Sequence, residues 1–310
     1  MSMSSQTAIQ NIPKRRKKIT RQQIAPYIFV SPFIISFLVF LAYPLVQAFM
    51  LSFQQLVPFS MDVEWVGLDN FRRVLIDHRF FSALWNVARY TFWTCAILIP
   101  VPMFISFIVN SRFTKCKSLI RSLLFIPVLT STIIAGIVFQ HMFSSEPTGA
   151  FNEFVALFGV DPVRWLHRPG TAMFALVFIA VWRWTGVNMI YFLSGLNNVP
   201  TELYESAEVD GANGMQKFFF ITTPMLKPII IFVLTISITA GFALFNEPYV
   251  FWGVTSPNDI GTTVVILIYR AAFMLNDFGY AATLGVTLFL IVMIVNMLQL
   301  KIMGLFRKDD

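Results

Sequence analysis

The stretch ELYESAEVDGANGMQKFFFITTP, residues Glu202–Pro224, is a polar segment between two long apolar segments. Its first nine residues contain four acidic side chains, and two glycines follow before the chain becomes apolar again. Its apolar neighbours, roughly Thr171–Leu193 and Pro228–Tyr249, each have the length of about 20 residues that a helix needs to cross a membrane. This order predicts two membrane helices joined by a structured loop.

The composition of the whole chain also indicates a membrane protein. Of its 310 residues, 56% are hydrophobic and 13% are charged, against about 45–50% and about 25% in soluble domains. The net charge of +7 is grouped beside apolar segments, as in KRRKK (Lys14–Lys18). Such grouping is typical of cytoplasmic topology signals, so we expect no nucleic-acid partner. Cys95 and Cys116 lack the spacing of a metal site and are interpreted as packing residues.

Six segments are predicted to span the membrane. They are roughly Pro26–Phe53, Trp85–Asn110, Ser122–Phe143, Thr171–Leu193, Pro228–Tyr249 and Ala281–Ile302. If KRRKK is cytoplasmic, both termini are cytoplasmic, and 15 of the 23 Lys and Arg residues lie inside while 6 lie in outer loops. We therefore expect an all-α, multi-pass protein of the cell membrane, with a basic tail over residues 1–25, a transmembrane domain over residues 26–310 and a cytoplasmic loop over residues 194–227. The outer stretch Val57–Leu75 is expected to be an ordered segment.

Few polar side chains fall inside the predicted spans. A charge in the hydrocarbon costs at least about 2.5–3.5 kcal/mol at the helix centre, so such residues normally face a cavity or a partner. We expect a hydrophilic pathway lined by Arg183, Asn188, Asn246 and Glu247. The alternative is a purely structural pairing of Arg183, with Glu247 or with another subunit. Pro248 is predicted to kink the fifth span beside Glu247.

The loop itself has the pattern of two short helices joined by a turn. Pro200 suits the first turn of a helix, and the acidic residues that follow complement the positive end of the helix dipole. Gly211 and Gly214 permit a sharp turn, while the small residues Ala207 and Ala212 let another surface approach closely. The pattern favours a docking element for a cytoplasmic partner over a solvated linker, which would lack apolar periodicity.

No catalytic motif is present. The sequence contains no G-x-x-x-x-G-K-[ST] phosphate loop, no H-E-x-x-H and no G-x-S-x-G, and the three histidines lack metal-ligand spacing. We therefore expect a protein that is not an enzyme and that binds no metal or cofactor of its own.

The loop resembles the motif E-A-A, three residues, G, nine residues, I-x-L-P of ATP-binding-cassette importer permeases. The matching positions are Glu205-Ser206-Ala207, Gly211 and Ile221-Thr222-Thr223-Pro224, with Ser206 and Thr223 as departures. Asp210, Ala212 and Phe218 extend the match to the longer form of the carbohydrate, maltose-type branch. Further resemblances to this branch are Trp65–Phe71, Asn86, Trp182 with Gly186, and Asp277–Thr283, while Thr255–Pro257 departs from its pattern.

This resemblance implies the type I importer permease fold with six membrane helices. It implies a carbohydrate as substrate, delivered by an extracytoplasmic binding protein, and a second, homologous permease as partner. Two ATP-binding subunits would carry ATP and Mg and would dock on the coupling loop, our name for residues 194–227. The docking residues implied are Glu205, Ala207, Asp210, Gly211, Ala212, Ile221 and Pro224.

Two other functions remain open from the residues alone. An ion-coupled secondary transporter of small polar solutes would have internal repeats and several deep acidic residues, whereas only Glu247 is acidic near a span. A membrane scaffold would tolerate scrambling of Glu205–Pro224.

Overall fold

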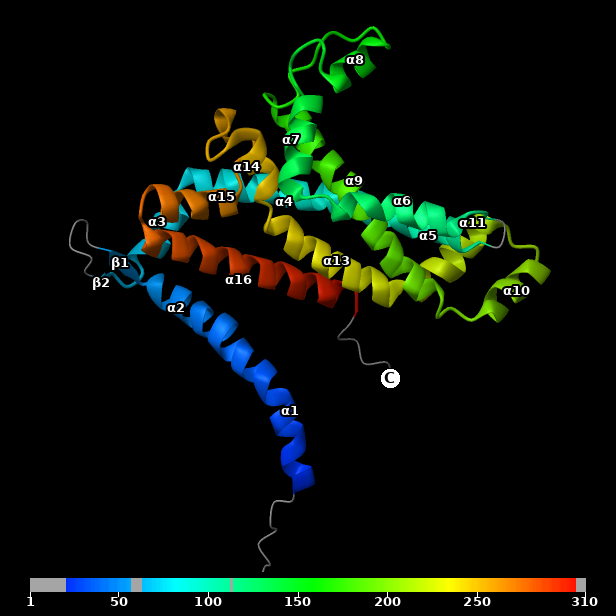
Figure 1. Ribbon diagram of the computed structural model, residues 1–310, viewed down its shortest axis with the longest axis horizontal. Coiled ribbons are helices and arrows are strands. Elements are labelled where there is room, and N and C mark those ends of the chain that lie inside the picture. The colour runs from blue at the N-terminus through cyan, green and yellow to red at the C-terminus, as the bar shows by residue number, and fades with distance from the viewer. Residues whose placement is uncertain (1–20, 57–62, 112–113, 305–310) are drawn as a thin grey trace, which may run out of the picture. The chain divides into compact units, whose positions relative to one another are not determined.

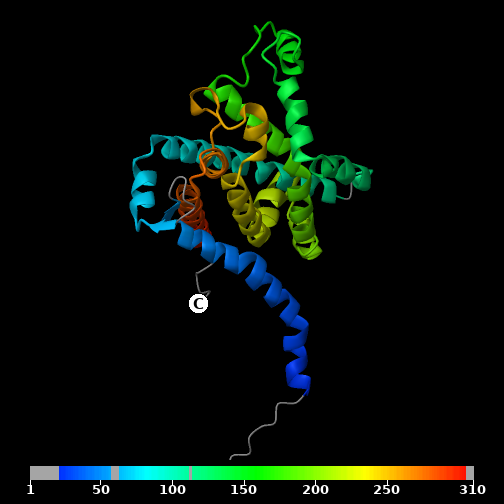
Figure 2. The same ribbon diagram turned by 60° about the vertical axis from the view of Figure 1, so that its left-hand side comes forward.

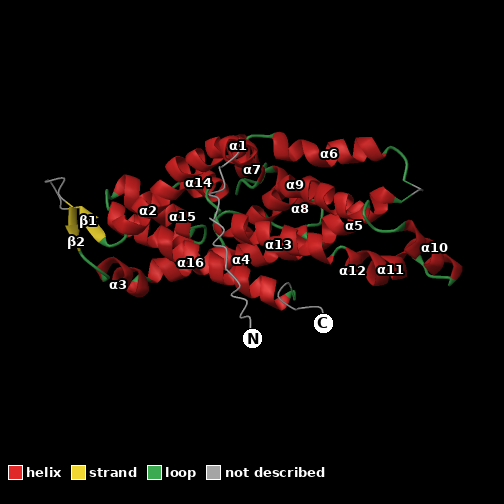
Figure 3. Ribbon diagram, turned by 90° about the horizontal axis from the view of Figure 1, so that it is seen from below, coloured by secondary structure: helices red, strands yellow, loops and turns green. Residues whose placement is uncertain are grey.

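The computed structural model of the chain describes residues 21–56, 63–111 and 114–304. In these residues helices predominate, and a small antiparallel pair of strands, β1 (Gln54–Leu56) and β2 (Val63–Trp65), places Gln54 opposite Trp65 (Figure 3). The KRRKK segment lies outside the described residues, as does most of the predicted tail over residues 1–25, so both remain predictions.

The helices follow one another along the chain with short connections. In order they are α1 (Arg21–Phe37), η1 (Leu38–Ala42), α2 (Tyr43–Leu51), α3 (Asp69–Ile76), α4 (His78–Leu98), α5 (Pro100–Asn110), α6 (Lys117–Leu129), α7 (Thr132–Met142), α8 (Ala150–Ala156), α9 (Pro169–Leu196), α10 (Thr201–Val209), α11 (Gly214–Lys217), η2 (Phe218–Thr222), α12 (Thr223–Met225), α13 (Lys227–Phe242), α14 (Asn246–Trp252), η3 (Pro257–Asp259), α15 (Val264–Tyr269), η4 (Arg270–Met274) and α16 (Phe278–Ile302).

The chain divides into two units, one up to Gln47 and one from Ala48 onwards. In the first unit, α1, the π-helical turn η1 and the start of α2 form a helix in which no side chain between Pro26 and Gln47 is buried. The π turn directly precedes Tyr43-Pro44, and the Tyr43 N–H bonds Leu38 O. A proline has no N–H for the regular helical hydrogen bond, and the shifted π bond keeps the chain helical at this point.

The second unit is a helical bundle centred on α9. Four helices in it are long and apolar enough to cross a membrane, namely His78–Asn110, Pro169–Leu196, Lys227–Trp252 and Phe278–Ile302. With Pro26–Leu51 of the first unit they make five candidate spans. The α9 helix packs against α4, α5, α6 and α13, and α13 packs against α4 and α16 (Figure 1). These five spans confirm five of the predicted segments, with boundaries that differ by up to seven residues at the start of the second.

The third predicted span, Ser122–Phe143, is wrong as a single helix. It consists of α6 and α7, which meet at an angle of 94°, so the pair forms either a broken sixth span or a re-entrant loop (Figure 2). The break lies at Thr130, whose N–H and Oγ1 both bond Pro127 O, with Oγ1 at 2.6 Å. Thr130 and Ser131 take extended conformations, so the helical ladder ends there and a new helix begins at Thr132.

The break between α4 and α5 has a clear chemical cause. Pro102 stands four residues after Leu98 and cannot donate the helical N–H that Leu98 O would normally accept. Asn188 of α9 replaces it, with its side-chain Nδ2 donating to Leu98 O at 2.9 Å. In a membrane-spanning helix a freed carbonyl needs such a substitute, because lipid offers no donor.

The break in the fifth predicted span lies elsewhere than expected. The helix ends at Phe242, and α14 begins at Asn246, so the irregular residues are Ala243–Phe245 and not the position of Pro248. Pro248 lies in the first turn of α14, where its missing N–H costs no helical hydrogen bond. Leu244 O accepts a hydrogen bond from Thr263 Oγ1 at 2.8 Å, which again satisfies a backbone group that the break sets free.

The end of the bundle that carries β1, β2 and α3 is held by side chains that bond the backbone of the Ser52–Gln54 turn. Asn70 is buried and donates to Ser52 O and Gln54 O, at 3.2 and 2.9 Å. Thr283 of α16 donates to Ser52 O at 3.0 Å. Gly279 lets β1 approach, since a Cβ there would lie 2.0 Å from Gln54 O.

Residues 63–75 of the expected outer segment are thus ordered, while residues 57–62 lie outside the described part. The coupling loop occupies the opposite end (Figures 1 and 3).

Candidate functional site

The coupling loop begins with α10, which ends in a Schellman motif. The Ala212 N–H bonds Ala207 O at 2.8 Å, and the Gly211 N–H bonds Glu208 O at 3.1 Å. Gly211 has a φ of +79°, which a residue with a Cβ rarely adopts. The predicted sharp turn at Gly211 is present, and glycine is needed there for its backbone angle.

The return from this turn is fixed by a second local device. Asn213 and Gln216 form a capping box, in which each side chain accepts a hydrogen bond from the other residue's backbone N–H, at 2.9 and 2.7 Å. The π turn η2 follows and again directly precedes a proline, with the Thr223 N–H bonding Phe218 O before Pro224. The helix–turn–helix predicted from the sequence is therefore the observed local structure.

Two side-chain contacts join the halves of the loop. Tyr204 of α10 and Thr222 of η2 are hydrogen-bonded through their hydroxyl groups at 2.9 Å. Lys217 Nζ lies 3.5 Å from Glu208 Oε1. Phe218 is buried against Phe104 and Phe107 of α5, with ring centroids 5.4 and 5.3 Å apart. These contacts connect the loop to a membrane-spanning helix, so a force on the loop would reach α5 through packed rings.

The turn encloses a surface hollow of about 300 Å³. Of the residues that the importer resemblance implies for docking, five line it, namely Ala207, Asp210, Gly211, Ala212 and Ile221. Glu205 and Pro224 are exposed but do not line it. At the two positions that depart from the motif, the side-chain hydroxyl groups bond the local backbone: Ser206 Oγ donates to Leu203 O, and Thr223 Oγ1 donates to Phe218 O. Neither departure alters the hollow.

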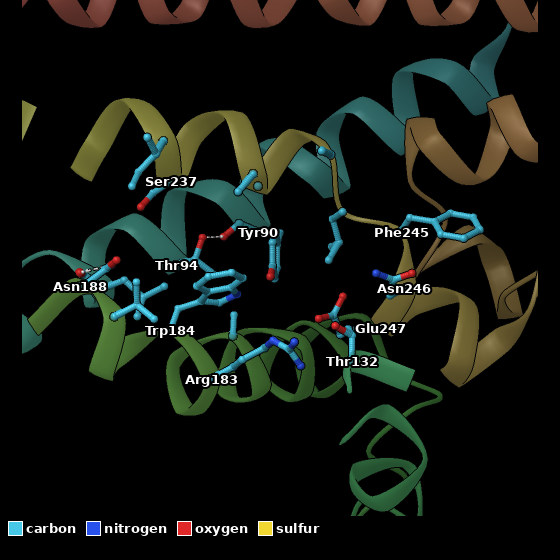
Figure 4. A pocket seen from close by; sticks show the side chains of 18 of the residues that line it. Tyr90, Thr94, Thr132, Arg183, Trp184, Asn188, Ser237, Phe245, Asn246 and Glu247 are labelled. Carbon is cyan, nitrogen blue, oxygen red and sulfur yellow. Dashed lines mark hydrogen bonds between the residues drawn. The ribbon is translucent and has the colours of Figure 1, made fainter. Parts of the chain in front are cut away.

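A second cavity, of about 340 Å³, lies between α4, α9, α13 and α14, and one wall is closed by Thr132 of α7 (Figure 4). All four residues expected along a hydrophilic pathway, Arg183, Asn188, Asn246 and Glu247, line this one cavity. Two come from α9 and two from the start of α14, which the break at Ala243–Phe245 turns toward α9. The structure brings the four together; their role toward a substrate remains a prediction.

Arg183 of α9 and Glu247 of α14 both line the cavity, and their side chains extend toward the same part of it (Figure 4). Arg183 is buried, and its Nη1 has no hydrogen-bond partner in the described part of the chain. The ion pairs found within 4.0 Å among the described residues do not include Arg183 with Glu247. The structural alternative, in which Arg183 pairs with Glu247 or with another subunit, stays a prediction. The guanidinium group lies 5.9 Å from the ring centroid of Trp184. The cavity thus presents separated donor and acceptor charges beside an aromatic ring.

Asn188 has a different role from the other three. Its Nδ2 is committed to Leu98 O, and the residue is buried. It holds the α4–α5 break in place and exposes only part of its surface to the cavity. Asn246, in contrast, is exposed, and no hydrogen bond of its side chain occurs within the described residues.

Other lining residues were not identified as such from the sequence. They add aromatic rings and hydroxyl groups, namely Tyr90, Thr94, Thr132, Trp184, Tyr191, Ser237 and Phe245. The sequence did contain a hint for Trp184, because Trp182 and Trp184 flank Arg183 and either indole could stack on a sugar. Trp182 instead packs on Phe139, with ring centroids 5.1 Å apart. The hydroxyl residues gave no signal, because Ser and Thr are common in membrane helices as donors to their own backbone, as Thr94 is here.

The described residues contain no cluster of three or more His, Cys, Asp or Glu side chains that could hold a metal ion. The two cysteines are both free, Cys95 in the core and Cys116 on the surface. The groups gathered around the cavity can form hydrogen bonds and stacking contacts with a polar solute.

Residues 99–302 match the family of binding-protein-dependent transport system inner membrane components. The chain is 45% identical over 288 residues to the arabinooligosaccharides transport system permease protein AraP of Bacillus subtilis, covering 93% of this chain and 91% of that protein. It is 31% identical to the lactose transport system permease protein LacF of Rhizobium radiobacter, covering 88% and 92%.

Among solved structures, the chain resembles a bacterial ABC transporter involved in the import of the acidic polysaccharide alginate, with a TM-score of 0.80 at 21% identity over 93% of this chain and 98% of that one. The same transporter in complex with an alginate pentasaccharide-bound periplasmic protein gives a TM-score of 0.79. The predicted type I permease fold is confirmed by this likeness and by the family. The chain belongs to the binding-protein-dependent transport system inner membrane components, and it is a membrane permease of an ABC importer.

Proposed function

We propose that the chain is the translocating subunit of a carbohydrate importer and that its substrate is an oligosaccharide of the arabinose type. The observation that carries the proposal is the cavity, which combines aromatic rings, hydroxyl and amide groups and two opposed charges within about 340 Å³. Sugars present apolar C–H faces and many hydroxyl groups, so they suit sites in which a few polar groups are set among aromatic walls. The named relatives import arabino-oligosaccharides and lactose, which supports a sugar over an ion-coupled solute.

The proposed partners follow from the coupling loop and from the family. A second, homologous permease would complete the translocation path, and a periplasmic or surface-anchored binding protein would deliver the sugar to the outer face. Two ATP-binding subunits would dock on the hollow around Gly211 and would carry the ATP and Mg. The chain itself would have no enzymatic activity and would bind no cofactor. Its place would be the cell membrane of a prokaryote.

The proposed coupling is mechanical. Closing of the ATP-binding subunits would move α10, and the contacts of Phe218 with Phe104 and Phe107 would transmit this movement to α5. The α4–α5 break and the irregular residues 243–245 divide the helices around the cavity into shorter rods. Rigid rods joined at breaks can switch between two packings, which is how an inward and an outward opening can alternate.

The substrate class can be tested with the assembled importer in proteoliposomes. Labelled arabino-oligosaccharides, maltose and glycerol phosphate are offered in turn together with the cognate binding protein. Accumulation of the arabino-oligosaccharide is expected. Accumulation of glycerol phosphate alone would contradict a carbohydrate substrate.

The location of the sugar path can be tested with two neighbouring tryptophans. Trp184→Ala removes an aromatic wall of the cavity, whereas Trp182→Ala removes a ring that packs on Phe139. Sugar uptake is expected to fall about 2- to 10-fold for Trp184→Ala, the range that about 0.5–1.5 kcal/mol of aromatic contact corresponds to. The Trp182→Ala variant is the matched control and should transport nearly as well as the parent. Equal effects of the two substitutions would place the sugar path elsewhere.

A further inference from the structure

A third concave site lies on the other side of the contact between α4 and α9. It is a groove of about 360 Å³, open to the surface. Arg89, Trp93 and Ile97 line it from α4, each one turn beyond the last, and residues of the first three turns of α9, from Pro169 to Val177, form the facing wall. No acidic residue belongs to the lining.

Arg89 is the one charged group among the residues that line this groove. Its Nε is buried, and it has no hydrogen-bond partner among the described residues. Neither a hydrogen bond nor an ion pair of its other guanidinium nitrogens occurs there. Arg89 as a whole is partly buried. A charge that is partly removed from water and has no counter-charge costs free energy, so this guanidinium against apolar walls indicates an anionic ligand that is missing from the isolated chain.

The position of Arg89 along its helix indicates where that ligand comes from. The candidate span His78–Asn110 has 33 residues, and its end at Asn110 belongs to the coupling-loop side. With a rise of about 1.5 Å per residue, Arg89 lies roughly 32 Å from Asn110, close to the hydrocarbon thickness of about 30 Å. Arg89 therefore lies at the level of the outer headgroups, while Trp93 and Ile97 lie within the hydrocarbon.

The facing helix, α9, also favours an anion at the Arg89 end of the groove. The α9 helix runs in the same direction as α4, since Asn188 far along α9 bonds Leu98 far along α4. Its first residues, Pro169 and Gly170, are therefore at the Arg89 end of the groove. A Cβ at Gly170 would meet nothing within 4 Å, so there is open space at this end. The unbonded N–H groups of a helix N-terminus favour an anion there.

We propose that this groove, the Arg89 groove, binds an anionic phospholipid of the outer leaflet, with the phosphate at Arg89 and an acyl chain along Trp93 and Val177. Trp93 and Phe174 are about half exposed, at 51% and 47%, and they supply the apolar wall that a soluble anion would not need. The inference does not depend on the substrate of the permease.

The test uses the fluorescence of Trp93 in the assembled importer. The importer is reconstituted in phosphatidylcholine vesicles that contain a minor share of either brominated phosphatidylglycerol or brominated phosphatidylcholine. The signal of the Trp93→Phe variant is subtracted, so that only the quenching of Trp93 is measured. Brominated phosphatidylglycerol is expected to quench Trp93 at a concentration about fivefold lower, the factor that corresponds to about 1 kcal/mol per basic residue at an anionic lipid.

The Arg89→Gln variant should remove this preference, so that both brominated lipids quench alike. Arg72→Gln is the matched control, because Arg72 is an exposed arginine of α3 that bonds Asp69 and does not line the groove. It should keep the preference. Added inorganic phosphate should leave the quenching unchanged, because it cannot fill the apolar walls.

Three results would overturn the inference. Equal quenching by the two lipids in the parent protein would show that the charge does not select an anion. Absence of quenching by either lipid would show that a partner subunit covers the groove. Displacement of the brominated phosphatidylglycerol by phosphate would show that the site binds the free anion.

Discussion

The coupling loop and the cavity around Arg183 and Glu247 are built in opposite ways. The turn of the loop is held by hydrogen bonds between residues at most five positions apart, in the Schellman motif at Gly211 and the capping box at Asn213. The cavity is built from residues 90 to 247, and its geometry depends on bonds such as Asn188 to Leu98 and Thr263 to Leu244. Local motifs determine the turn of the loop, whereas long-range contacts determine the cavity.

This difference has a physical cause. Most residues of α10 and of the turn after it are exposed, so the backbone groups there need only the caps that neighbouring residues provide. The cavity requires helices that break inside an apolar bundle, and each break frees a carbonyl that must find a donor there. Distant polar side chains supply these donors. Gln140 gives a third case, since its Nε2 donates to the last carbonyls of α14, Val250 O and Phe251 O, at 3.1 and 3.2 Å.

Among the predictions that test this difference between loop and cavity, the largest effect is expected from a substitution of Gly211. The Gly211→Pro substitution fixes φ near −65°, against the observed +79°, and removes the N–H that bonds Glu208 O. The turn cannot form, so the docking surface is lost while the membrane helices stay intact. Coupled uptake is expected to fall below about a tenth of the parent value, a loss of at least about 1.4 kcal/mol in coupling. The measurement is sugar uptake per inserted permease.

Gly214→Ala is the control for this experiment. Gly214 does not have a positive φ, and a methyl group there would meet nothing within 4 Å. It should support normal uptake. Normal uptake by Gly211→Pro at normal expression would contradict the docking role of the loop.

A smaller effect is expected from Glu247, the acidic residue that lines the cavity. Glu247→Gln keeps the size of the side chain but replaces an ionised acceptor by a neutral amide. If Glu247 bonds the sugar, uptake should fall about fivefold, since the negative charge adds about 1 kcal/mol to a hydrogen bond that the amide oxygen can still accept. Initial rates of sugar uptake are the measurement. Glu153→Gln on the exposed face of α8 should have no effect, and an unchanged rate in Glu247→Gln would return this residue to a structural role.

The smallest effect on transport, with a clear effect on stability, is expected at Asn188. Asn188→Ala leaves Leu98 O buried without a donor, which costs about 1–3 kcal/mol. The thermal midpoint of the purified complex should drop, whereas Asn246→Ala should leave it unchanged because Asn246 is exposed. Equal midpoints for the two variants would mean that Asn188 is not needed at the α4–α5 break.

Prediction from the sequence succeeded for features that depend on the summed hydrophobicity of a segment or on residues close together in the chain. The lengths of the apolar segments predicted five of the candidate spans, and the spacing of Glu205, Gly211 and Pro224 predicted both the loop structure and the family. The prediction failed at the third span, because Thr130 and Ser131 are individually compatible with a membrane helix. It also misplaced the break in the fifth span. A proline can kink a helix or can lie in the first turn of a new helix, and Pro248 does the second.

The sequence by itself determined that this chain lies in a membrane, that its coupling loop is a helix–turn–helix and that Arg183 and Glu247 are expected to face something other than lipid. These follow from hydrophobicity and from interactions between near neighbours. Only the tertiary structure decided that four polar residues meet in one cavity, that Asn188 bonds a carbonyl freed by a helix break, and that Arg89 lies in a groove without a partner among the described residues. Such properties depend on which helix faces pack together, and packing in an apolar bundle is determined by contacts between residues far apart in the chain.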